Sequence, residues 1–418
     1  MPKNIILLCD GTSNEIARNR TNILRLYGCL KKDEDQLVFY DPGVGTFGAE
    51  NAWLAFWRRA VEVWGLITGW GLDANVKEAY RFLVENYDDG KRENVTDEEP
   101  DRIYIIGFSR GAYTARVLAG FIHALGLIEA RNLNLLSYAY RAYKNIGQAT
   151  GRDVTDAREP DRNPFAEVRL FERMLRPRRP AIRALGLFDT VGSVIEWSAR
   201  LPRIRNHAHV SENPSVRSVR HALAIDERRT MYLPTPWPGG GEYWGSAFRP
   251  RDESRIEPQD VDEVWFSGVH GDVGGGYPEK HSQLAKFPLK WMIDELRPLG
   301  VRFKEPTVRR LVLGEDPDGR YVGPDPLAPH NVSMKGIWKL VEFLPFYKTR
   351  YSLSRRKTFL GFYLPLFEYR HIPEGARVHA SVFVRRGTKA DYPQPNIPAD
   401  HVVVGEAEGE VDGGNASV

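Results

Sequence analysis

Short apolar segments recur along the chain, and each of them ends in polar or glycine-rich residues. Five segments have this pattern: residues 5–9, 36–40, 102–106, 184–188 and 261–266. Continuous apolar runs of this length, bounded by turn residues, are typical of strands that are buried on both faces. Residues 52–87 and 112–125 have helical periodicity instead. Because strands alternate with helices, the pattern predicts an α/β fold with a mostly parallel sheet and helices on both of its faces.

The residues that follow the predicted strands include the ones best suited to chemistry. Residues 10–12 follow the first strand, Ser109 the third, Asp189 the fourth and His270 the last. In open α/β sheets, ligands bind where the carboxyl ends of the strands meet. We therefore expect a functional site at this edge of the sheet.

Composition narrows the classes of protein that fit. The net charge of +3 gives no electrostatic argument for binding nucleic acid. The two cysteines, Cys9 and Cys29, lack the spacing of metal ligands, and we expect neither a metal nor a cofactor. We find no signal peptide and no apolar run of about 18 residues. We expect a protein that is cytoplasmic as synthesised, and export without a cleaved signal peptide stays open.

The segment Gly107-Phe108-Ser109-Arg110-Gly111 carries the clearest chemical signal. A serine hydroxyl is a weak nucleophile until a base removes its proton. In the Gly-x-Ser-x-Gly arrangement the serine lies on a strained turn between a strand and a helix, whose N-terminus supplies donors for an oxyanion. An apolar strand precedes the serine here and a helical pattern follows it. Ser109 is therefore the predicted nucleophile.

An activated serine needs a histidine as its base and a carboxylate that orients the histidine. When the serine lies on such a turn, the acid and then the histidine follow it along the chain. Asp189 and His270 both follow predicted strands in this order. Asp272 remains an alternative acid or a support for the histidine loop. His221, in a segment with a helical appearance, and His379, in a late predicted strand, remain alternative bases.

Six ordered motifs resemble those of one protein family. They are Leu8-Cys9-Asp10-Gly11-Thr12, Asp41-Pro42-Gly43-Val44-Gly45-Thr46, Gly107-Phe108-Ser109-Arg110-Gly111-Ala112, Phe188-Asp189-Thr190-Val191-Gly192, Ala222-Leu223-Ala224-Ile225-Asp226-Glu227-Arg228-Arg229, and the segment from Trp265 to Tyr277. Over residues 4–386 the chain is similar to the catalytic domain of type VI secretion phospholipase effectors. That domain also occurs in proteins that are not effectors.

The resemblance implies an α/β-hydrolase fold and a catalytic triad at Ser109, Asp189 and His270. For the effector members it implies hydrolysis of glycerophospholipid esters. The corresponding mechanism is acyl transfer to the serine, with the histidine as base and then acid and the aspartate fixing its tautomer.

A tetrahedral intermediate also needs donors for its oxyanion. By analogy with α/β-hydrolases, the first is the backbone N–H of Arg110, the residue after the nucleophile. The second is expected from the turn after the first strand, from Gly11 or Thr12. The Asp10 carboxylate is expected to order this turn.

The last part of the chain has a different composition. Residues 336–370 interleave aromatic side chains with Lys and Arg, which suits either a cap packed over the core or peripheral contact with a membrane surface. Residues 377–386 are predicted as a late strand. We expect one α/β-hydrolase catalytic domain over residues 1–400, with a cap or insertion at 330–370. Residues 401–418 are predicted as a disordered tail.

The predicted function is serine-dependent hydrolysis of lipid or phospholipid acyl esters. Two alternatives stay open: a carboxylesterase for small soluble esters, and a non-catalytic interaction protein built on a hydrolase scaffold. A lipid or ester substrate is the partner that the sequence predicts. It predicts no nucleic-acid partner, and it identifies no secretion or immunity partner.

Overall fold

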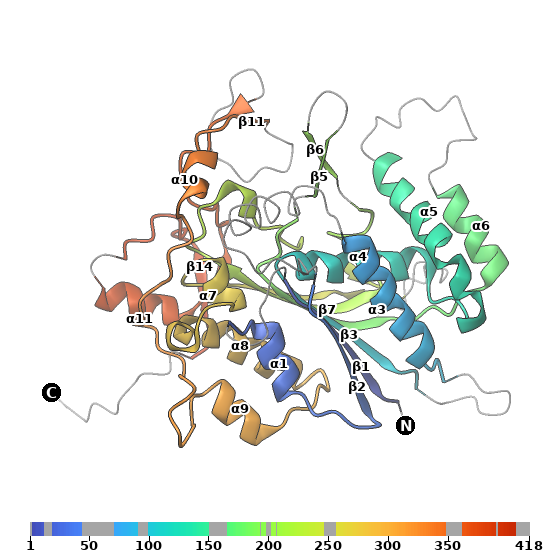
Figure 1. Cartoon of the computed structure of the whole chain (residues 1–418), viewed down its shortest axis with the longest axis horizontal. Helices are drawn as coiled ribbons and strands as arrows, with labels where there is room; N and C mark the ends of the chain where they lie inside the picture. Colours follow the sequence, from blue (N-terminus) through green and yellow to red (C-terminus); the bar gives the residue numbers. More distant parts are fainter. Residues whose placement is uncertain are drawn as a thin grey trace, which may run out of the picture.

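The computed structural model describes residues 2–11, 19–43, 71–90, 99–149, 165–192, 194–197, 202–205, 207–245, 256–347, 362–389 and 392–406. An eight-stranded sheet forms its centre (Figure 1). The strand order is β2 (Gln36–Asp41), β1 (Asn4–Cys9), β3 (Arg102–Phe108), β4 (Ile182–Phe188), β7 (Val216–Ala224), β10 (Asp260–Phe266), β13 (Ala376–His379) and β14 (His401–Val404). Neighbouring strands are parallel throughout, so all eight end at the same edge.

Helices cover both faces of this sheet, because side chains alternate between the faces along each strand. On β1, Ile5 and Leu7 face one hydrophobic core, while Ile6 and Leu8 face the other. The first core lies under α3 (Leu72–Asn86), α4 (Arg110–Leu125), α5 (Leu136–Ala149) and α6 (Ala166–Leu175). The second lies under α1 (Asn22–Cys29), α8 (Gln283–Leu296) and α9 (Glu305–Leu311), on the opposite side of the sheet in Figure 1. This layering confirms the predicted α/β-hydrolase-like fold.

The segment around His221 is a strand and not the helix that its sequence suggested. It forms β7, which pairs with β4 on one side and β10 on the other. Arg220 and His221, two of the charged or polar side chains in this strand, are buried and have partners inside the fold. Arg220 donates to Asp260 and Glu295, and His221 Nδ1 pairs with Glu263 over 2.6 Å. Long-range pairing therefore overrides the local pattern in this strand.

The end of the chain also differs from its predicted structure. The predicted strand at 377–386 is divided: β13 ends at His379, whose side chain accepts from Ser381 N, and α11 (Ala380–Thr388) begins there. A side-chain acceptor at this position favours the start of a helix. Residues 401–404 are not part of a disordered tail, since they form β14 on β13. Residues 407–418 lie outside the described residues.

Three short hairpins and a short helix lie outside the central sheet. The hairpins are β5 (Val194–Trp197) with β6 (Pro202–Arg205), β8 (Glu242–Tyr243) with β9 (Glu257–Pro258), and β11 (Phe346–Tyr347) with β12 (Phe362–Tyr363). The helix α10 (Ile337–Val341) leads into β11, and both project at the top of the view in Figure 1. Across the described residues, the helices lack the length and apolar character needed to cross a bilayer.

Candidate active site

Ser109 lies at the topological switch point of the sheet, where the strand order reverses between β1 and β3. β1 and β3 are neighbours, but the strand order continues from β1 to β2 on one side and from β3 to β4 on the other. The segments that leave the carboxyl ends of two such strands diverge and open a crevice between them. Ser109 directly follows β3, and Asp10 and Gly11 directly follow β1. The predicted nucleophile and the predicted oxyanion turn therefore follow the two strands at which the strand order reverses, where open α/β sheets bind their ligands.

The turn that carries Ser109 requires the two glycines that flank it. Ser109 has φ 59° and ψ −122°, a strained conformation for a residue with a side chain. A Cβ on Gly107 would lie 2.4 Å from the carbonyl oxygen of Gly111, and a Cβ on Gly111 would lie 2.1 Å from the carbonyl oxygen of Cys9. Only glycine allows β1, β3 and α4 to approach this closely.

Ser109, His270 and Asp189 form one hydrogen-bonded line. The Ser109 hydroxyl lies 2.8 Å from Nε2 of His270, and Nδ1 of His270 lies 2.5 Å from Oδ2 of Asp189. His270 begins α7 (His270–Gly274) after β10, and Asp189 follows β4 with φ 40°. The ring of Phe108 packs against the His270 imidazole at 4.7 Å. This arrangement can pass a proton from the serine to the histidine.

The Asp189 carboxylate is fully buried and surrounded by donors. Ala224 N donates to Oδ1 over 3.0 Å, and the guanidinium of Arg370 contacts both carboxylate oxygens. Burial alone would raise the pKa of Asp189, but the charge of Arg370 and the hydrogen bond from His270 hold it well below its usual range. Asp189 is therefore ionised at neutral pH. The sequence analysis missed Arg370, because a single arginine in an aromatic segment carries no local signal.

Asp272 holds the histidine loop. Its carboxylate accepts from Val269 N over 3.0 Å and from the backbone and side chain of Asn331. Burial raises the pKa of Asp272 to about 6, although these hydrogen bonds oppose the shift. Of the two roles left open for Asp272, the contacts fit support of the loop.

Glu227 is a second supporting carboxylate that the sequence analysis did not single out. It accepts from the backbone N–H of His270 over 3.2 Å and from the Arg229 guanidinium over 2.9 Å. Burial alone would raise the pKa of Glu227, but the charge of Arg229 lowers it to about 2. The motif from Ala222 to Arg229 contained this residue, and its acidic–basic pattern was the available signal.

Two of the three predicted oxyanion donors, Arg110 and Gly11, are among the described residues, and both lie close to Ser109. Arg110 is the first residue of α4, which places its backbone N–H at the N-terminus of this helix, directly after Ser109. Gly11 is close to the nucleophile, since a Cβ there would lie 3.6 Å from Cβ of Ser109. Its N–H donates to Oδ1 of Asp10 over 2.7 Å. Thr12 lies outside the described residues.

The carboxylate of Asp10 contacts three groups around the turn after β1. Its carboxylate is buried and accepts from the hydroxyl of Thr21 over 2.5 Å and from that of Tyr40 over 2.9 Å. Burial raises the pKa of Asp10 to about 6, against the opposing effect of these hydrogen bonds.

The two alternative histidines have other partners. Nε2 of His221 accepts from Thr190 N over 3.2 Å, and His379 caps α11. Burial lowers the pKa of both side chains, that of His379 to about 4. Among the three candidates, His270 is the one whose ring contacts Ser109. In the part of the chain that the structure describes, no three metal-ligating side chains gather, and both cysteines are buried thiols.

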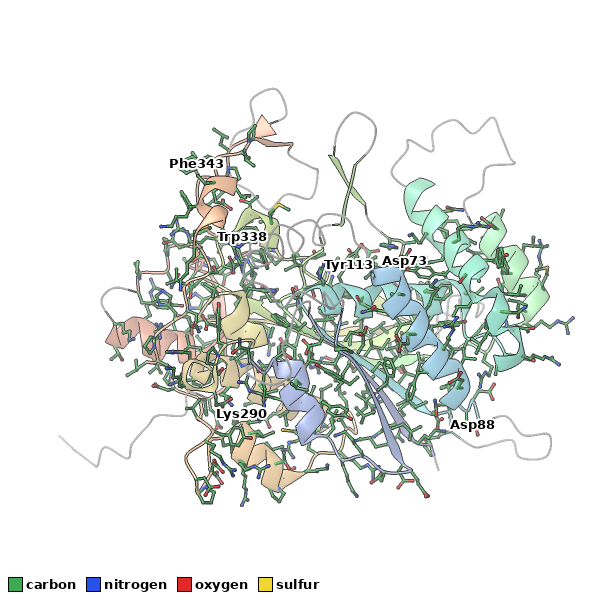
Figure 2. The ribbon with its side chains drawn as sticks, in the orientation of Figure 1. Asp73, Asp88, Tyr113, Lys290, Trp338 and Phe343 are labelled. Atoms are coloured by element: carbon green, nitrogen blue, oxygen red, sulfur yellow. The ribbon has the colours of Figure 1, made fainter. Side chains whose placement is uncertain are left out.

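Two aromatic side chains, Tyr232 and Trp338, pack in sequence beside His270. Tyr232 packs its edge against the His270 ring at 4.9 Å, and Trp338 of α10 packs against Tyr232 at 5.5 Å. The Arg229 guanidinium lies 3.6 Å over the Tyr232 ring. In Figure 2, Trp338 lies nearer the body of the molecule than Phe343, which projects beyond it. The described part of the predicted cap therefore adjoins the site.

Comparisons with known proteins identify a family and several similar proteins. A family model, the catalytic domain of Tle1-like phospholipase effectors of type VI secretion, matches residues 3–295. The chain is also similar to the uncharacterized protein YEL023C of Saccharomyces cerevisiae, with 30% identity over 239 residues. The match covers 55% of this chain and 32% of the yeast protein, so the chain spans about a third of that relative.

Two solved structures are similar in part. One is an uncharacterized protein from Pseudomonas aeruginosa, with a TM-score of 0.41, 19% identity, and coverage of 78% of this chain and 49% of that chain. The other is the Tle1 effector bound to the VgrG spike of the type VI secretion system, with a TM-score of 0.33, 17% identity, and coverage of 68% and 53%.

The close approach at Gly111 predicts a stability effect. Because a methyl group there would collide with the backbone after β1, Gly111→Ala should lower the free energy of unfolding by about 1–3 kcal/mol or more. Gly387→Ala is the control, since a Cβ at Gly387 in α11 meets nothing within 4 Å. Urea unfolding of both variants measures the difference. Equal stabilities would contradict the steric argument.

Proposed function

The chain belongs to the family of Tle1-like catalytic domains of type VI secretion phospholipase effectors, and on this premise we propose that it is a serine-dependent lipid ester hydrolase. The observation that carries the proposal is the hydrogen-bonded line of Ser109, His270 and Asp189 on a strained turn at the carboxyl edge of the sheet. A glycine-rich turn without chemistry needs neither a strained serine nor a buried carboxylate beside a histidine.

The proposed reaction is acyl transfer in two steps. His270 Nε2 takes the proton of Ser109 as Oγ attacks the ester carbonyl, and the tetrahedral intermediate collapses when the imidazolium protonates the leaving alcohol. Water then attacks the acyl-serine and gives its proton to His270. The second tetrahedral intermediate collapses as the imidazolium returns this proton to Oγ of Ser109, which releases the acid and restores the enzyme. The ionised Asp189 holds the neutral histidine with its proton on Nδ1 and stabilises the imidazolium in both steps.

The backbone N–H of Arg110 is the proposed first oxyanion donor. Its place at the start of α4 supports this role, because helix N-termini direct backbone donors and a partial positive charge toward an anion. The second donor is proposed in the turn after β1, from Gly11 or Thr12.

An exposed apolar ridge beside the site supports a lipid substrate over a small soluble ester. The ridge consists of Leu340, Phe343, Leu344 and Leu364, which are 70%, 57%, 54% and 45% exposed. The ring of Phe343 packs edge-on against the ring of Phe367, with 5.6 Å between the ring centroids. This contact joins the segment after α10 to the segment after β12. Large apolar side chains gathered on a surface are typical of protein or membrane contacts.

Charge near the ridge favours an anionic lipid surface. Lys335 and Lys339 are exposed beside it, whereas Glu342 is buried and accepts from the backbone and hydroxyl of Thr230. Residues 348–361, between β11 and β12 in the sequence, contain five basic residues and no acidic one. Each basic residue near an anionic membrane contributes about 1 kcal/mol of attraction. We propose that the ridge contacts lipid while the adjoining site cleaves an acyl ester.

Replacing the nucleophile tests the proposed function. Ser109→Ala should lower kcat by a factor on the order of 10⁶, as is typical for the loss of a triad serine, and abolish labelling by a fluorophosphonate probe. Turnover of phospholipid and short ester substrates, with labelling in parallel, measures both effects. Ser137→Ala, at an exposed serine of α5, is the control and should behave as the wild type. Activity above a few per cent in Ser109→Ala would place the chemistry elsewhere.

The base and the acid have separable effects. His270→Ala should be nearly as inactive as Ser109→Ala, whereas Asp189→Asn should lower kcat by a factor on the order of 10⁴, because the histidine and the oxyanion donors remain. His379→Ala, which removes a helix cap and not the base, should retain kcat. Steady-state kinetics of the three variants decides the assignment, and an inactive His379→Ala beside an active His270→Ala would reverse it.

The ridge predicts a difference between lipid and soluble substrates. Phe343→Ser combined with Leu340→Ser should weaken binding to anionic vesicles at low salt and lower turnover of vesicle phospholipid, yet spare a short soluble ester. Vesicle cosedimentation at low and high salt, with both substrates assayed, measures this. Leu170→Ser with Met174→Ser, at exposed apolar residues of α6, is the matched control. Equal losses on both substrates with a lower melting temperature would show that the ridge packs as a structural cap.

A further inference from the structure

Arg370 holds the carboxylate of Asp189 from a part of the chain well beyond residue 295, where the family match ends. Its Nη1 donates to Oδ1 over 2.6 Å, and its Nη2 donates to Oδ2 over 3.0 Å. A planar guanidinium that spans both oxygens of a carboxylate combines charge with fixed geometry. The side chains are 2% and 0% exposed, so solvent screens this pair very little.

Other contacts fix the position of Arg370. Nη1 also donates to the carbonyl oxygen of Ala224 over 2.8 Å, and Nη2 donates to that of Tyr232 over 2.5 Å. The Arg370 carbonyl oxygen accepts from Nδ2 of Asn396, which also donates to the carbonyl oxygen of Ile225. The guanidinium is thus held by the carbonyl groups of Ala224 and Tyr232, and the backbone of Arg370 is held by Asn396 of the C-terminal segment. It reaches Asp189 as part of a preformed network.

We propose that Arg370 is a positioning residue for ester hydrolysis, which keeps Asp189 ionised and oriented toward His270. The inference rests on the proposed function, because the orientation of Asp189 matters to catalysis only if His270 acts as the base. Arg370 acts through Asp189 and is not itself a catalytic residue. The chain beyond residue 295 therefore completes a site whose other members lie within the family match.

The charge of Arg370 opposes protonation of Asp189. Burial alone would raise the pKa of Asp189, and the charge of Arg370 is the largest of the effects that hold this pKa low. Removing the charge should therefore raise the pKa of Asp189. A protonated Asp189 orients His270 less well as a base, so without Arg370 the acidic limb of the pH–rate profile should move to higher pH.

Other titratable groups around Asp189 are engaged with partners of their own. His221 on β7 pairs with a carboxylate of β10, and its Nε2 accepts from the residue after Asp189. Glu227, on the segment after β7, pairs with Arg229. Among the residues that the structure describes, Arg370 is the lysine or arginine that forms an ion pair with Asp189. Its removal is therefore the substitution that isolates the carboxylate charge.

Arg370→Met tests the proposal because it keeps apolar bulk and removes the charge. We expect kcat and kcat/KM at pH 7 to fall together by about 10²-fold, as a misplaced catalytic group typically costs. The acidic limb of kcat/KM against pH should move up by about one pH unit, in line with the effect of an arginine on a neighbouring aspartate. Arg370→Lys keeps the positive charge but loses the planar guanidinium, so its pH–rate profile should shift less than that of Arg370→Met.

A double variant separates positioning from general support of the fold. In an Asp189→Asn background, Arg370 has no carboxylate to orient, so adding Arg370→Met should change kcat by less than about threefold. Arg385→Met is the matched control, since Arg385 is equally buried in α11 and donates to backbone carbonyls of Pro326 and Ala328. It should lower the melting temperature without moving the pH–rate profile.

The outcomes distinguish this inference from the proposed function. If Ser109→Ala is inactive but Arg370→Met and Arg370→Lys keep the wild-type kcat and pH profile, the role of Arg370 is overturned and the function stands. An equal loss from Arg370→Met in the wild-type and Asp189→Asn backgrounds also overturns it. If Arg370→Met does not fold, Arg370→Lys in the two backgrounds gives the same comparison. Full turnover by Ser109→Ala would reject the function itself.

Discussion

Asp189 carries a carboxylate with no solvent exposure, and such a charge is costly to bury unless hydrogen-bond donors and a counter-charge surround it. Those groups come from three separate parts of the chain. Ala224 at the end of β7 contacts Oδ1, His270 at the start of α7 contacts Oδ2, and Arg370 after β12 contacts both oxygens. The carboxylate therefore ties together the segments that form the site, and its ionised state depends on all of them.

The parallel sheet makes this convergence possible. Because all eight strands end at one edge, Ser109, Asp189 and His270 meet there, although Ser109 and His270 are 161 positions apart in the sequence. The start of α4 leaves no room for a Cβ at Gly107, and the end of β1 leaves none at Gly111. Close backbone packing thus holds Ser109 in a strained conformation that a looser turn would relax.

Ring contacts connect the site to α10, the helix in which the apolar ridge begins. Trp338 in α10 packs against Tyr232, and Tyr232 packs against His270 and accepts a hydrogen bond from Arg370 through its carbonyl oxygen. The exposed ridge begins two residues further along the same helix, at Leu340. A surface that meets lipid through this ridge would therefore lie beside the serine. This proximity is a physical reason to favour a lipid ester over a small soluble one.

Local patterns in the sequence determined the layered α/β fold, the strained serine turn and the selection of Ser109, Asp189 and His270 as candidates. Apolar runs, flanking glycines and chain order are signals that a short window contains. Only the tertiary structure decided that the His221 segment is a central strand, because the partners of Arg220 and His221 lie on other elements. It alone identified Arg370 and Glu227 and gave Asp272 its place on the loop. Pairing of buried charges over long sequence separations leaves no periodicity in the sequence, so these roles became visible only when the chain was folded.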